Sequence, residues 1–343
     1  MIKILFFSSV ADVKLFNLTG FYVEDIKALK NAGFKVEITN KYLSFFKFWK
    51  YDVAFLYFYK KAIIPALIAR CFFKKIIYTG GVDEISSEIF LSKKKKFIFK
   101  LFFILNCFLS NRCNIVSNSD MKNAIQIFSK KLRWLENKLS YYPHSIDTIK
   151  YITPDISIKE DICVTICWMS SIENVKRKGV DKAIFFFKSI KNTHPNFKLY
   201  IVGSLGEGSD FLKAIILKEG LTDSIIFTGE ISEVKKIDLL KRSKFYLQFS
   251  SYEGFGLAVI EAMALKNLIL HSGNGGLKDT IADKGFIVKD FVYFQDAIRI
   301  FNDLNLNFNN NNKLLEANWK VVINQFSSQS RSKYFKELIK NIC

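Results

Sequence analysis

Proline, glycine and paired cysteines are scarce in this chain of 343 residues. It has four prolines and 16 glycines, too few for a collagen-like or a low-complexity disordered protein. Its six cysteines form no C-x-x-C pair, so we expect no redox or zinc motif of that kind and a reduced, cytoplasmic protein. Its three histidines, His144, His194 and His271, lack metal-ligand spacing, and no metal is expected.

A hydrophobic run long enough to cross a membrane is also missing. The longest such run, Phe97–Leu109, is shorter than the roughly 20 residues that span a bilayer, and Lys100 and Asn106 interrupt it. The opening Met1–Phe7 is a short apolar run, typical of a buried strand rather than of a signal peptide. We therefore expect the chain to enter its fold at once and to lack a transmembrane helix.

Positive charge is concentrated in the first part of the chain. The net charge is +19, and residues 1–145 account for +14 of it, with 24 basic and 10 acidic residues. Lys93–Lys96 leads into Phe97–Phe103, and lysines beside aromatics at helical spacing suit an anionic membrane surface. A core helix entered through a solvated lysine turn fits the same residues. Both interpretations can hold, because a helix can bury one face and rest another on lipid.

Nucleic acid is a second partner that positive charge attracts. No recognition motif of the common types occurs in the sequence, so we expect no nucleic-acid partner. A dinucleotide dehydrogenase is also disfavoured, because no G-x-G-x-x-G follows the first expected strand.

Short apolar runs alternate with segments of helical periodicity along the whole chain. This pattern predicts an α/β protein with parallel sheets covered on both faces. In the first half, strands are expected near Ile2–Phe7, Lys35–Thr39, Asp52–Phe58, Lys75–Thr79 and Asn114–Ser117. In the second half, they are expected near Ile162–Trp168, Phe197–Val202, Ser224–Phe227, Phe245–Phe249, Leu268–His271 and Phe286–Val288. The stretch from Pro143 to Lys159 is the expected boundary, and residues 307–312 are expected to form a surface loop.

The most informative segment is Ser250–Ala264, which follows an expected strand and opens an expected helix. Gly254 and Gly256 leave room for a ligand to approach the backbone. The amides at the helix start would face that ligand with the positive end of the helix dipole, which favours a phosphate. These amides belong to Phe255, Gly256 and Leu257.

Two glutamates flank this helix start. Glu253 stands on the loop before the helix and Glu261 on the helix itself. A carboxylate there can accept hydrogen bonds from hydroxyls, as acidic residues in nucleotide-binding folds do from ribose. Two carboxylates around one phosphate seat predict a sugar-nucleotide site.

The string E-G-F-G-L-x-x-x-E-A-M-A resembles the signature of the retaining glycosyltransferases of family four, the glycosyl transferases group 1, which have the GT-B fold. Further landmarks follow in the family's order and spacing from about residue 160 to 290; they are Lys178–Asp181, Leu199–Gly203, Ile226–Gly229 and Gly275–Asp279. The resemblance implies two Rossmann-like domains facing a central cleft. It also implies an acceptor-binding domain over residues 1–150, a nucleotide-sugar domain over 151–320, and a C-terminal helix over 321–343 that packs back on the first domain.

The same resemblance implies roles for single residues. Glu253 would hold hydroxyls of the transferred sugar, Lys178 the departing diphosphate and Glu261 the ribose. The full set of implied donor-binding residues besides Glu253 and Lys178 is Arg177, Gly203, Gly229, Gly254, Phe255, Gly256, Leu257 and Glu261. Lys178 and the helix amides would supply the charge that other transferases draw from a cation, so no metal or other cofactor is implied. Retaining members need no dedicated protein base.

The first domain resembles the family more loosely. Leu18–Tyr22 falls where members have a glycine loop, Thr79–Glu84 falls at a strand end, and Tyr142–Asp147 falls just before the second domain. Asp83 is the catalytic candidate on this side. The acceptor-side candidates are Gly20, Asp83, Glu84 and His144.

One departure from the family is clear. Members carry a Gly-Arg pair after the first strand of the second domain, whereas this chain reads Ile166–Ser170 without an arginine; Arg177 is the candidate replacement. The expected function is transfer of a hexose from a UDP- or GDP-sugar to a saccharide or lipid-linked saccharide. That reaction would serve bacterial surface polysaccharide or lipopolysaccharide synthesis, with the enzyme peripheral on the inner face of the cell membrane. The alternative is a non-catalytic nucleotide-sugar or glycan-binding protein with a degenerate donor site.

Overall fold

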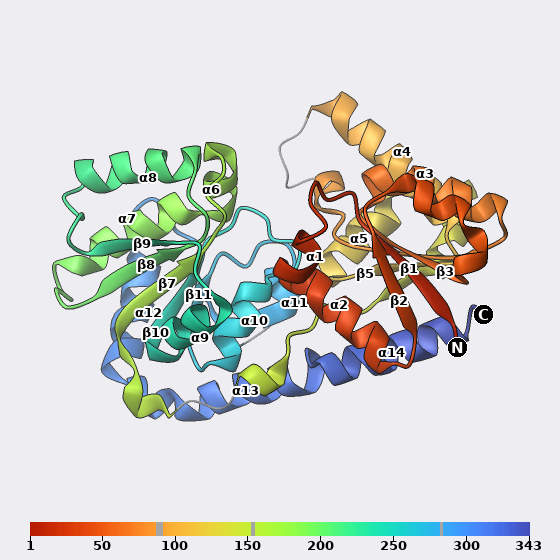
Figure 1. Cartoon of the computed structure of the whole chain (residues 1–343). Helices are drawn as coiled ribbons and strands as arrows, with labels where there is room; N and C mark the ends of the chain where they lie inside the picture. Colours follow the sequence, from red (N-terminus) through yellow and green to blue (C-terminus); the bar gives the residue numbers. More distant parts are fainter. Residues whose placement is uncertain (87–91, 152–154, 282–283) are drawn as a thin grey trace. The chain divides into compact units, whose positions relative to one another are not determined.

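Two six-stranded parallel sheets organise the protein in its computed structural model (Figure 1). The structure describes residues 1–86, 92–151, 155–281 and 284–343. The chain divides into a first unit of Met1–Asp147 with Gln325–Cys343, and a second unit of Thr148–Asn324. The predicted α/β class with two Rossmann-like domains is confirmed. No described helix is long and apolar enough to cross a membrane.

The first unit is built on the strand order β2-β1-β3-β4-β5-β6. Its strands are β1 Lys3–Phe7, β2 Lys35–Thr39, β3 Val53–Tyr57, β4 Lys75–Thr79, β5 Arg112–Ile115 and β6 Leu139–Tyr141. Its α-helices are α1 Leu15–Leu18, α2 Gly20–Asn31, α3 Tyr59–Cys71, α4 Lys93–Leu109, α5 Asn118–Ile127 and α14 Ser328–Lys340. Short 3₁₀ helices span Tyr42–Phe46, Phe48–Lys50, Asp83–Ile85 and Lys130–Lys138. All five residues of β3 are buried, as expected for a central strand covered on both faces.

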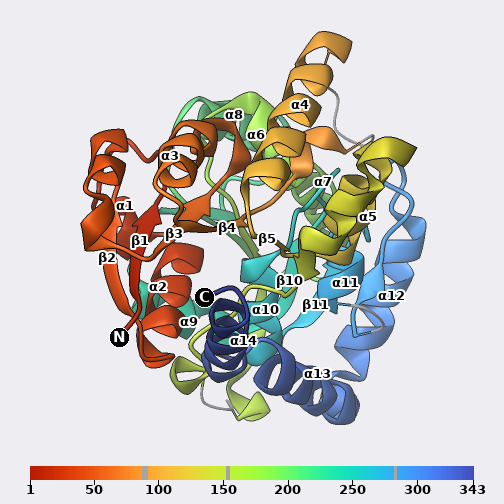
Figure 2. The ribbon, with the colours of Figure 1, turned by 90° about the vertical axis from the view of Figure 1, so that its right-hand side faces the viewer.

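Separate apolar layers cover the two faces of this sheet. One layer joins the sheet to α3 and α4 and includes Phe45, Ala66 and Phe103. The other joins it to α1, α2 and α14 and includes Phe16 and Phe335. Figures 1 and 2 both show α14 beside α2. The expected return of the C-terminal helix to the first domain is therefore confirmed.

The second unit follows the order β12-β11-β10-β7-β8-β9. Its strands are β7 Glu160–Ile166, β8 Lys198–Val202, β9 Ile225–Gly229, β10 Ser243–Gln248, β11 Leu268–His271 and β12 Phe286–Ile287. Its α-helices are α6 Ile172–Lys178, α7 Val180–Lys191, α8 Glu207–Lys218, α9 Glu233–Arg242, α10 Leu257–Ala264, α11 Leu277–Ile281, α12 Gln295–Leu306 and α13 Asn312–Gln325. Short 3₁₀ helices span Thr148–Lys150, Ile156–Ile158 and Phe308–Asn311.

Two local expectations differ from the structure. Residues 307–312, expected as a loop, contain a 3₁₀ turn at Phe308–Asn311 and the first residue of α13. The ring of Phe308 is buried in the core of the second unit, and this one apolar anchor orders a tract that is otherwise asparagine. The strand β6 was not expected, because its three residues Leu139–Tyr141 carry no alternating pattern.

Candidate active site

The carboxyl ends of β7, β8, β9 and β10 meet at one edge of the second sheet, because all its strands run parallel. Ligands of open α/β sheets bind at such an edge. The segment between β10 and α10 lies there, and α10 begins at Leu257 after Gly256, whose φ of +96° is in the left-handed region that favours glycine. The amide of Gly276 donates to the carbonyl of Glu253 at 2.6 Å. That bond ties this turn to the loop after β11.

Glu253 and Lys178 meet at this edge although 75 positions separate them in sequence. The ammonium of Lys178 lies 2.6 Å from Oε2 of Glu253, and both side chains are largely buried. The contact depends on Gly179, which ends α6 with a φ of +67°; a Cβ there would collide with the carbonyl of Phe249 at the end of β10. Glycine thus lets the two backbones approach, which aligns the lysine with the glutamate.

Buried polar side chains also contact the Glu253 carboxylate. Its Oε2 lies 3.3 Å from the hydroxyl of Ser250 and 3.4 Å from the amide nitrogen of Gln248. Gln248 also accepts a hydrogen bond from the hydroxyl of Tyr246 at 3.0 Å. Sequence reasoning missed Gln248 and Tyr246. The available signal was a glutamine at the end of a strand whose remaining residues are mostly apolar, since a buried amide needs partners.

Arg177 braces the glycine turn in this structure. Its guanidinium donates to the carbonyl of Tyr252 at 3.3 Å and to Oδ1 of Asn174 at 2.9 Å. The end of β7, where the family arginine is missing, carries Cys167, which is buried, and Trp168, which is 61% exposed. Arg177 therefore lies beside the Glu253 loop but reaches it through a backbone carbonyl.

Glu261 has close partners that the sequence did not reveal. Lys236 on α9 lies 2.8 Å from Glu261 and 3.0 Å from Glu233. The hydroxyl of Tyr151 donates to Glu233 at 3.1 Å and also reaches Glu261. Burial raises the pKa of Glu261, and the charge of Lys236 opposes that rise. Burial lowers the pKa of Lys236, but Glu261 and Glu233 outweigh it, so the net shift is upward.

The expected nucleotide-pocket glycines lie at neighbouring strand ends. Gly203 follows β8 and Gly229 ends β9, and the amide of Gly203 donates to the carbonyl of Gly229 at 3.1 Å. Phe255 is buried and Leu257 half-buried at the start of α10. The second unit thus brings every expected donor-side residue to the carboxyl edge of its sheet or to the helices that start there.

The acceptor-side candidates all belong to the first unit. Gly20 is the exposed first residue of α2, and Asp83 begins a 3₁₀ helix after β4. Glu84 continues that helix, and its side chain lies outside the described part of the structure. His144 is buried with its ring 5.7 Å from that of Phe21, and burial lowers its pKa to about 3.

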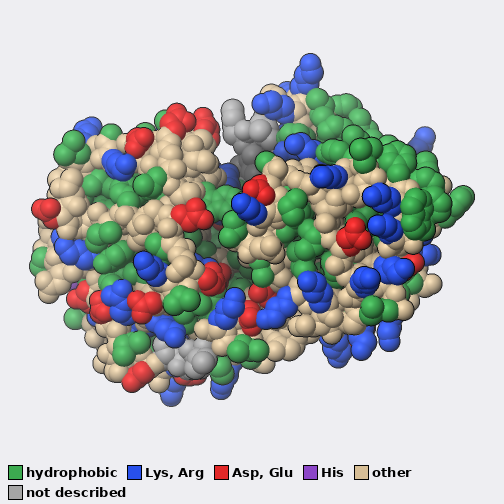
Figure 3. Space-filling model, viewed as in Figure 1, with side chains coloured by type: hydrophobic (Ala, Val, Ile, Leu, Met, Phe, Trp, Pro, Cys, Tyr) green, Lys and Arg blue, Asp and Glu red, His purple; other side chains and the backbone are tan. Residues whose placement is uncertain are grey.

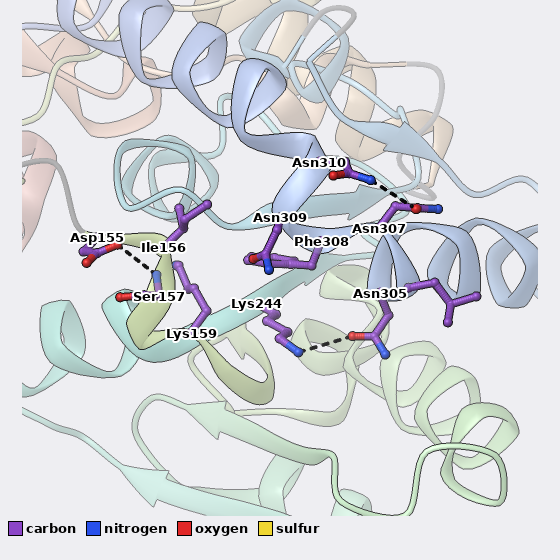
Figure 4. Close-up of a pocket in the computed structure, with 11 residues that line it drawn as sticks. Asp155, Ile156, Ser157, Lys159, Lys244, Asn305, Asn307, Phe308, Asn309 and Asn310 are labelled. Carbon is purple, nitrogen blue, oxygen red and sulfur yellow. Dashed lines mark hydrogen bonds between the residues drawn. The ribbon is translucent and has the colours of Figure 1, made fainter.

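Across the described ranges, no three His, Cys, Asp or Glu side chains come together as metal ligands. A polar pocket opens at the opposite, amino edge of the second sheet (Figure 4). There Lys159 donates to the carbonyls of Leu240, Ser243 and Leu265 at 2.7 to 3.1 Å, and Lys244 pairs with Asp161 at 2.6 Å. Both lysines are engaged with the protein itself, so this pocket is not the expected phosphate seat.

The second unit carries a match to a known family. Residues 169–323 match the family model of the glycosyl transferases group 1. The matched residues lie within the second unit. The resemblance predicted from the Glu253–Glu261 signature is confirmed, and the match covers nearly all the elements that build the site.

Curated relatives resemble only part of the chain. The uncharacterized glycosyltransferase YqgM of Bacillus subtilis is 29% identical over 124 residues, which are 36% of this chain and 34% of the relative. The lipopolysaccharide core biosynthesis mannosyltransferase LpcC of Rhizobium leguminosarum bv. viciae is 37% identical over 73 residues, 21% of this chain and 20% of the relative. The chain thus spans about a third or less of the length of these relatives.

Solved structures resemble the whole fold. Anabaena HepE, solved with UDP and glucose, matches with a TM-score of 0.76 over 99% of this chain and 100% of that one, at 15% identity. A glycosyltransferase from Rickettsia africae matches with a TM-score of 0.72 over 99% of this chain and 98% of that one, at 18% identity. The predicted GT-B class is therefore confirmed at the level of the fold.

Proposed function

We propose that this protein is a retaining glycosyltransferase that moves a hexose from a UDP- or GDP-sugar to a saccharide or lipid-linked saccharide. The observation that carries the proposal is the Lys178–Glu253 pair of 2.6 Å beside the glycine turn that opens α10. It unites a cation, a carboxylate and a helix start at the ligand-binding edge of a nucleotide fold. The UDP bound by HepE supports a nucleoside diphosphate as the donor group.

Each residue at this edge of the sheet would have its own part in the proposed reaction. The Lys178 ammonium and the amides of Phe255, Gly256 and Leu257 would stabilise the charge that develops on the leaving diphosphate. Glu253 would accept hydrogen bonds from the sugar and Glu261 from the ribose. With this positive charge supplied by the chain, we propose a metal-independent reaction. An acceptor hydroxyl would attack the sugar on the face from which the nucleoside diphosphate leaves, and its proton would pass to the departing phosphate, so that the configuration of the sugar is retained.

The first unit would bind the acceptor, through Gly20, Asp83, Glu84 and His144. Asp83 is the candidate to contact the acceptor hydroxyl. The lipopolysaccharide role in the name of the Rhizobium relative supports an acceptor of the bacterial surface. Such acceptors are assembled at a membrane, so we also propose a cytoplasmic enzyme that is peripheral on the inner face of the cell membrane.

A non-catalytic binding protein is the second candidate. It is favoured by the missing arginine after β7, where Cys167 and Trp168 stand. In the alternative, the protein would bind a nucleotide sugar or a glycan without catalysing transfer. Turnover therefore separates the two functions, whereas binding does not.

A thermal-shift screen with UDP, GDP and their common sugar conjugates tests the donor site. A ligand at a hundred times its Kd stabilises the folded protein by about 2.7 kcal/mol, so the correct nucleotide should raise the melting temperature. Glu261→Ala should abolish the shift. The matched control Glu316→Ala, which breaks the ion pair with Lys266 elsewhere in the second unit, should retain it. Release of nucleoside diphosphate from the bound sugar would support the transferase, and binding without release would favour the second candidate. No shift with any nucleotide would refute the transferase and would favour a glycan-binding protein whose donor site is degenerate.

A further inference from the structure

Large hydrophobic side chains stand exposed on three neighbouring segments of the first unit. We call residues 41–50, 59–74 and 93–109 together the basic aromatic face. Trp49 is 65% exposed, Phe73 93% and Phe97 69%. The others are Leu43, Phe46, Phe48, Ile64, Leu67, Ile98, Leu101, Leu105 and Phe108. Single exposed apolar residues are common, but a cluster of this size marks an interaction surface.

The three segments form one continuous surface. The helix α3 packs against both the 3₁₀ helix Tyr42–Phe46 and α4. Phe48 stacks on Phe72 with ring centroids 4.4 Å apart, and the ammonium of Lys60 lies 4.3 Å from the ring centre of Phe99 on α4. In Figure 3, hydrophobic side chains gather over the region of α3 and α4, with lysines and arginines around them.

The charge of this face is of one sign. Residues 41–50 contain three Lys or Arg, residues 59–74 four and residues 93–109 five, and none of these segments contains Asp or Glu. Such a surface repels a second copy of itself. A nucleic acid would pair with the lysines but leave the aliphatic side chains in water. An anionic bilayer satisfies both features, because its headgroups attract the lysines and its interface accepts aromatic and aliphatic side chains.

Phe73 adds an independent geometrical observation. It adopts a φ of +55°, in a region that residues other than glycine and asparagine rarely occupy. The strained turn projects its ring into solvent at 93% exposure instead of burying it. This conformation ends α3, because the amide of Lys74 then donates to the carbonyl of Ala69 at 2.9 Å.

We propose that the basic aromatic face docks the protein on an anionic lipid bilayer, with Leu43, Trp49 and Phe73 entering the interface and the surrounding lysines meeting the headgroups. The sequence-based expectation rested on the Lys93–Phe103 segment alone. The basic aromatic face adds residues 41–50 and 59–74, which are distant from that segment in sequence. This deepens the membrane association within the proposed function, but it does not depend on the donor chemistry, which is measured separately.

Flotation with lipid vesicles tests the docking face. At low salt, the wild-type chain should float with phosphatidylcholine vesicles that contain phosphatidylglycerol and not with phosphatidylcholine alone. Leu43→Ser, Trp49→Ser and Phe73→Asn combined should lower the partition coefficient at least about tenfold, with asparagine chosen because it tolerates the left-handed turn. The control combines Leu217→Ser, Tyr293→Ser and Leu306→Ser, which remove side chains 72 to 82% exposed on the second unit, and should float like the wild type.

Three outcomes would overturn the proposal. These are flotation of the face variant equal to that of the wild type, equal flotation with neutral vesicles, and no flotation of the wild type. If the triple variant changes only the oligomeric state in light scattering, the surface binds a second copy of the chain instead. If it changes only the binding of a homopolymeric RNA, the surface binds nucleic acid instead. The nucleotide thermal shift, measured on the same preparations, shows whether the variant is folded and whether the donor site itself has failed.

Discussion

In the second unit, neighbouring polar side chains contact each of the two glutamates of the signature. Glu253 is held by Lys178, Ser250 and Gln248, and Glu261 by Lys236 and Tyr151. A buried carboxylate that lacks such partners takes up a proton rather than stay charged. Lys236 and Tyr151 therefore limit the rise in the pKa of Glu261 that burial causes.

Changing Lys236 to Gln should shift the pH dependence of nucleotide binding. Burial raises the pKa of Glu261 and Lys236 limits that rise, so its removal raises the pKa further. Affinity, which needs the carboxylate, should then begin to fall at a higher pH as the solution is acidified. Measuring nucleotide affinity at a series of acidic pH values locates the pH at which the fall begins. Lys236→Arg should restore the wild-type pH at which affinity begins to fall. The control Lys235→Gln, which changes an exposed neighbour, should leave that pH unchanged. If that pH does not shift in Lys236→Gln, a ribose contact by Glu261 is contradicted.

Among the elements, α14 is held to the first unit by a buried ion pair. Arg331 and Asp25 are both fully buried and form a bidentate pair across α14 and α2. Arg331 also donates to the carbonyls of Tyr142 and Pro143 after β6, and Ser328 donates to Glu24. The final helix thus completes one face of the first sheet, although the whole second unit precedes it in the chain.

Arg331→Met should therefore destabilise the first unit strongly. Removing one partner of a buried pair leaves an uncompensated charge and costs about 3–5 kcal/mol. Replacing both partners, as in Asp25→Leu with Arg331→Met, should recover a large part of that loss. Arg242→Met breaks an exposed pair with Glu160 and should cost under about 1 kcal/mol. Urea unfolding at neutral pH measures all three variants, and equal losses for Arg331→Met and Arg242→Met would contradict this role of α14.

The stability of the whole molecule should depend on pH through two buried histidines, one in each unit. Burial lowers the pKa of His144 from 6.5 to about 3 and that of His271 from 6.5 to about 4. Between those values and 6.5 the unfolded chain binds protons that the folded chain does not. The stabilisation is therefore fully present above about pH 6.5 and falls as the pH is lowered.

Urea unfolding at a series of pH values from 7 to 4 measures this dependence. Each histidine contributes up to about 1.4 kcal/mol per pH unit within its window, so His144→Phe should flatten the decline by that amount. Phe21→Leu alters the same ring contact without removing a titrating group and should keep the wild-type slope. An unchanged slope in His144→Phe would mean that this histidine titrates normally in the folded protein.

The sequence by itself determined the class of the fold and the segment that carries the candidate site. Alternating apolar runs and helical periods are local properties, so they predicted two parallel sheets. The Glu253–Glu261 signature is likewise local, with its turn, helix start and two carboxylates inside one short segment. The short strand β6 and the turn at Phe308 were missed, because contacts with distant residues order them rather than any local pattern.

Only the tertiary structure decided which residues meet. The contact of Lys178 with Glu253 spans 75 positions and that of Lys236 with Glu261 spans 25, and both depend on strand order and on close backbone approach. Of the basic aromatic face, the sequence predicted only the Lys93–Phe103 segment, because residues 41–50 and 59–74 are distant from it in the chain. The sequence pattern shows which side chains are apolar. Only the folded structure shows which of them are buried in the core and which remain exposed, because the core has limited room.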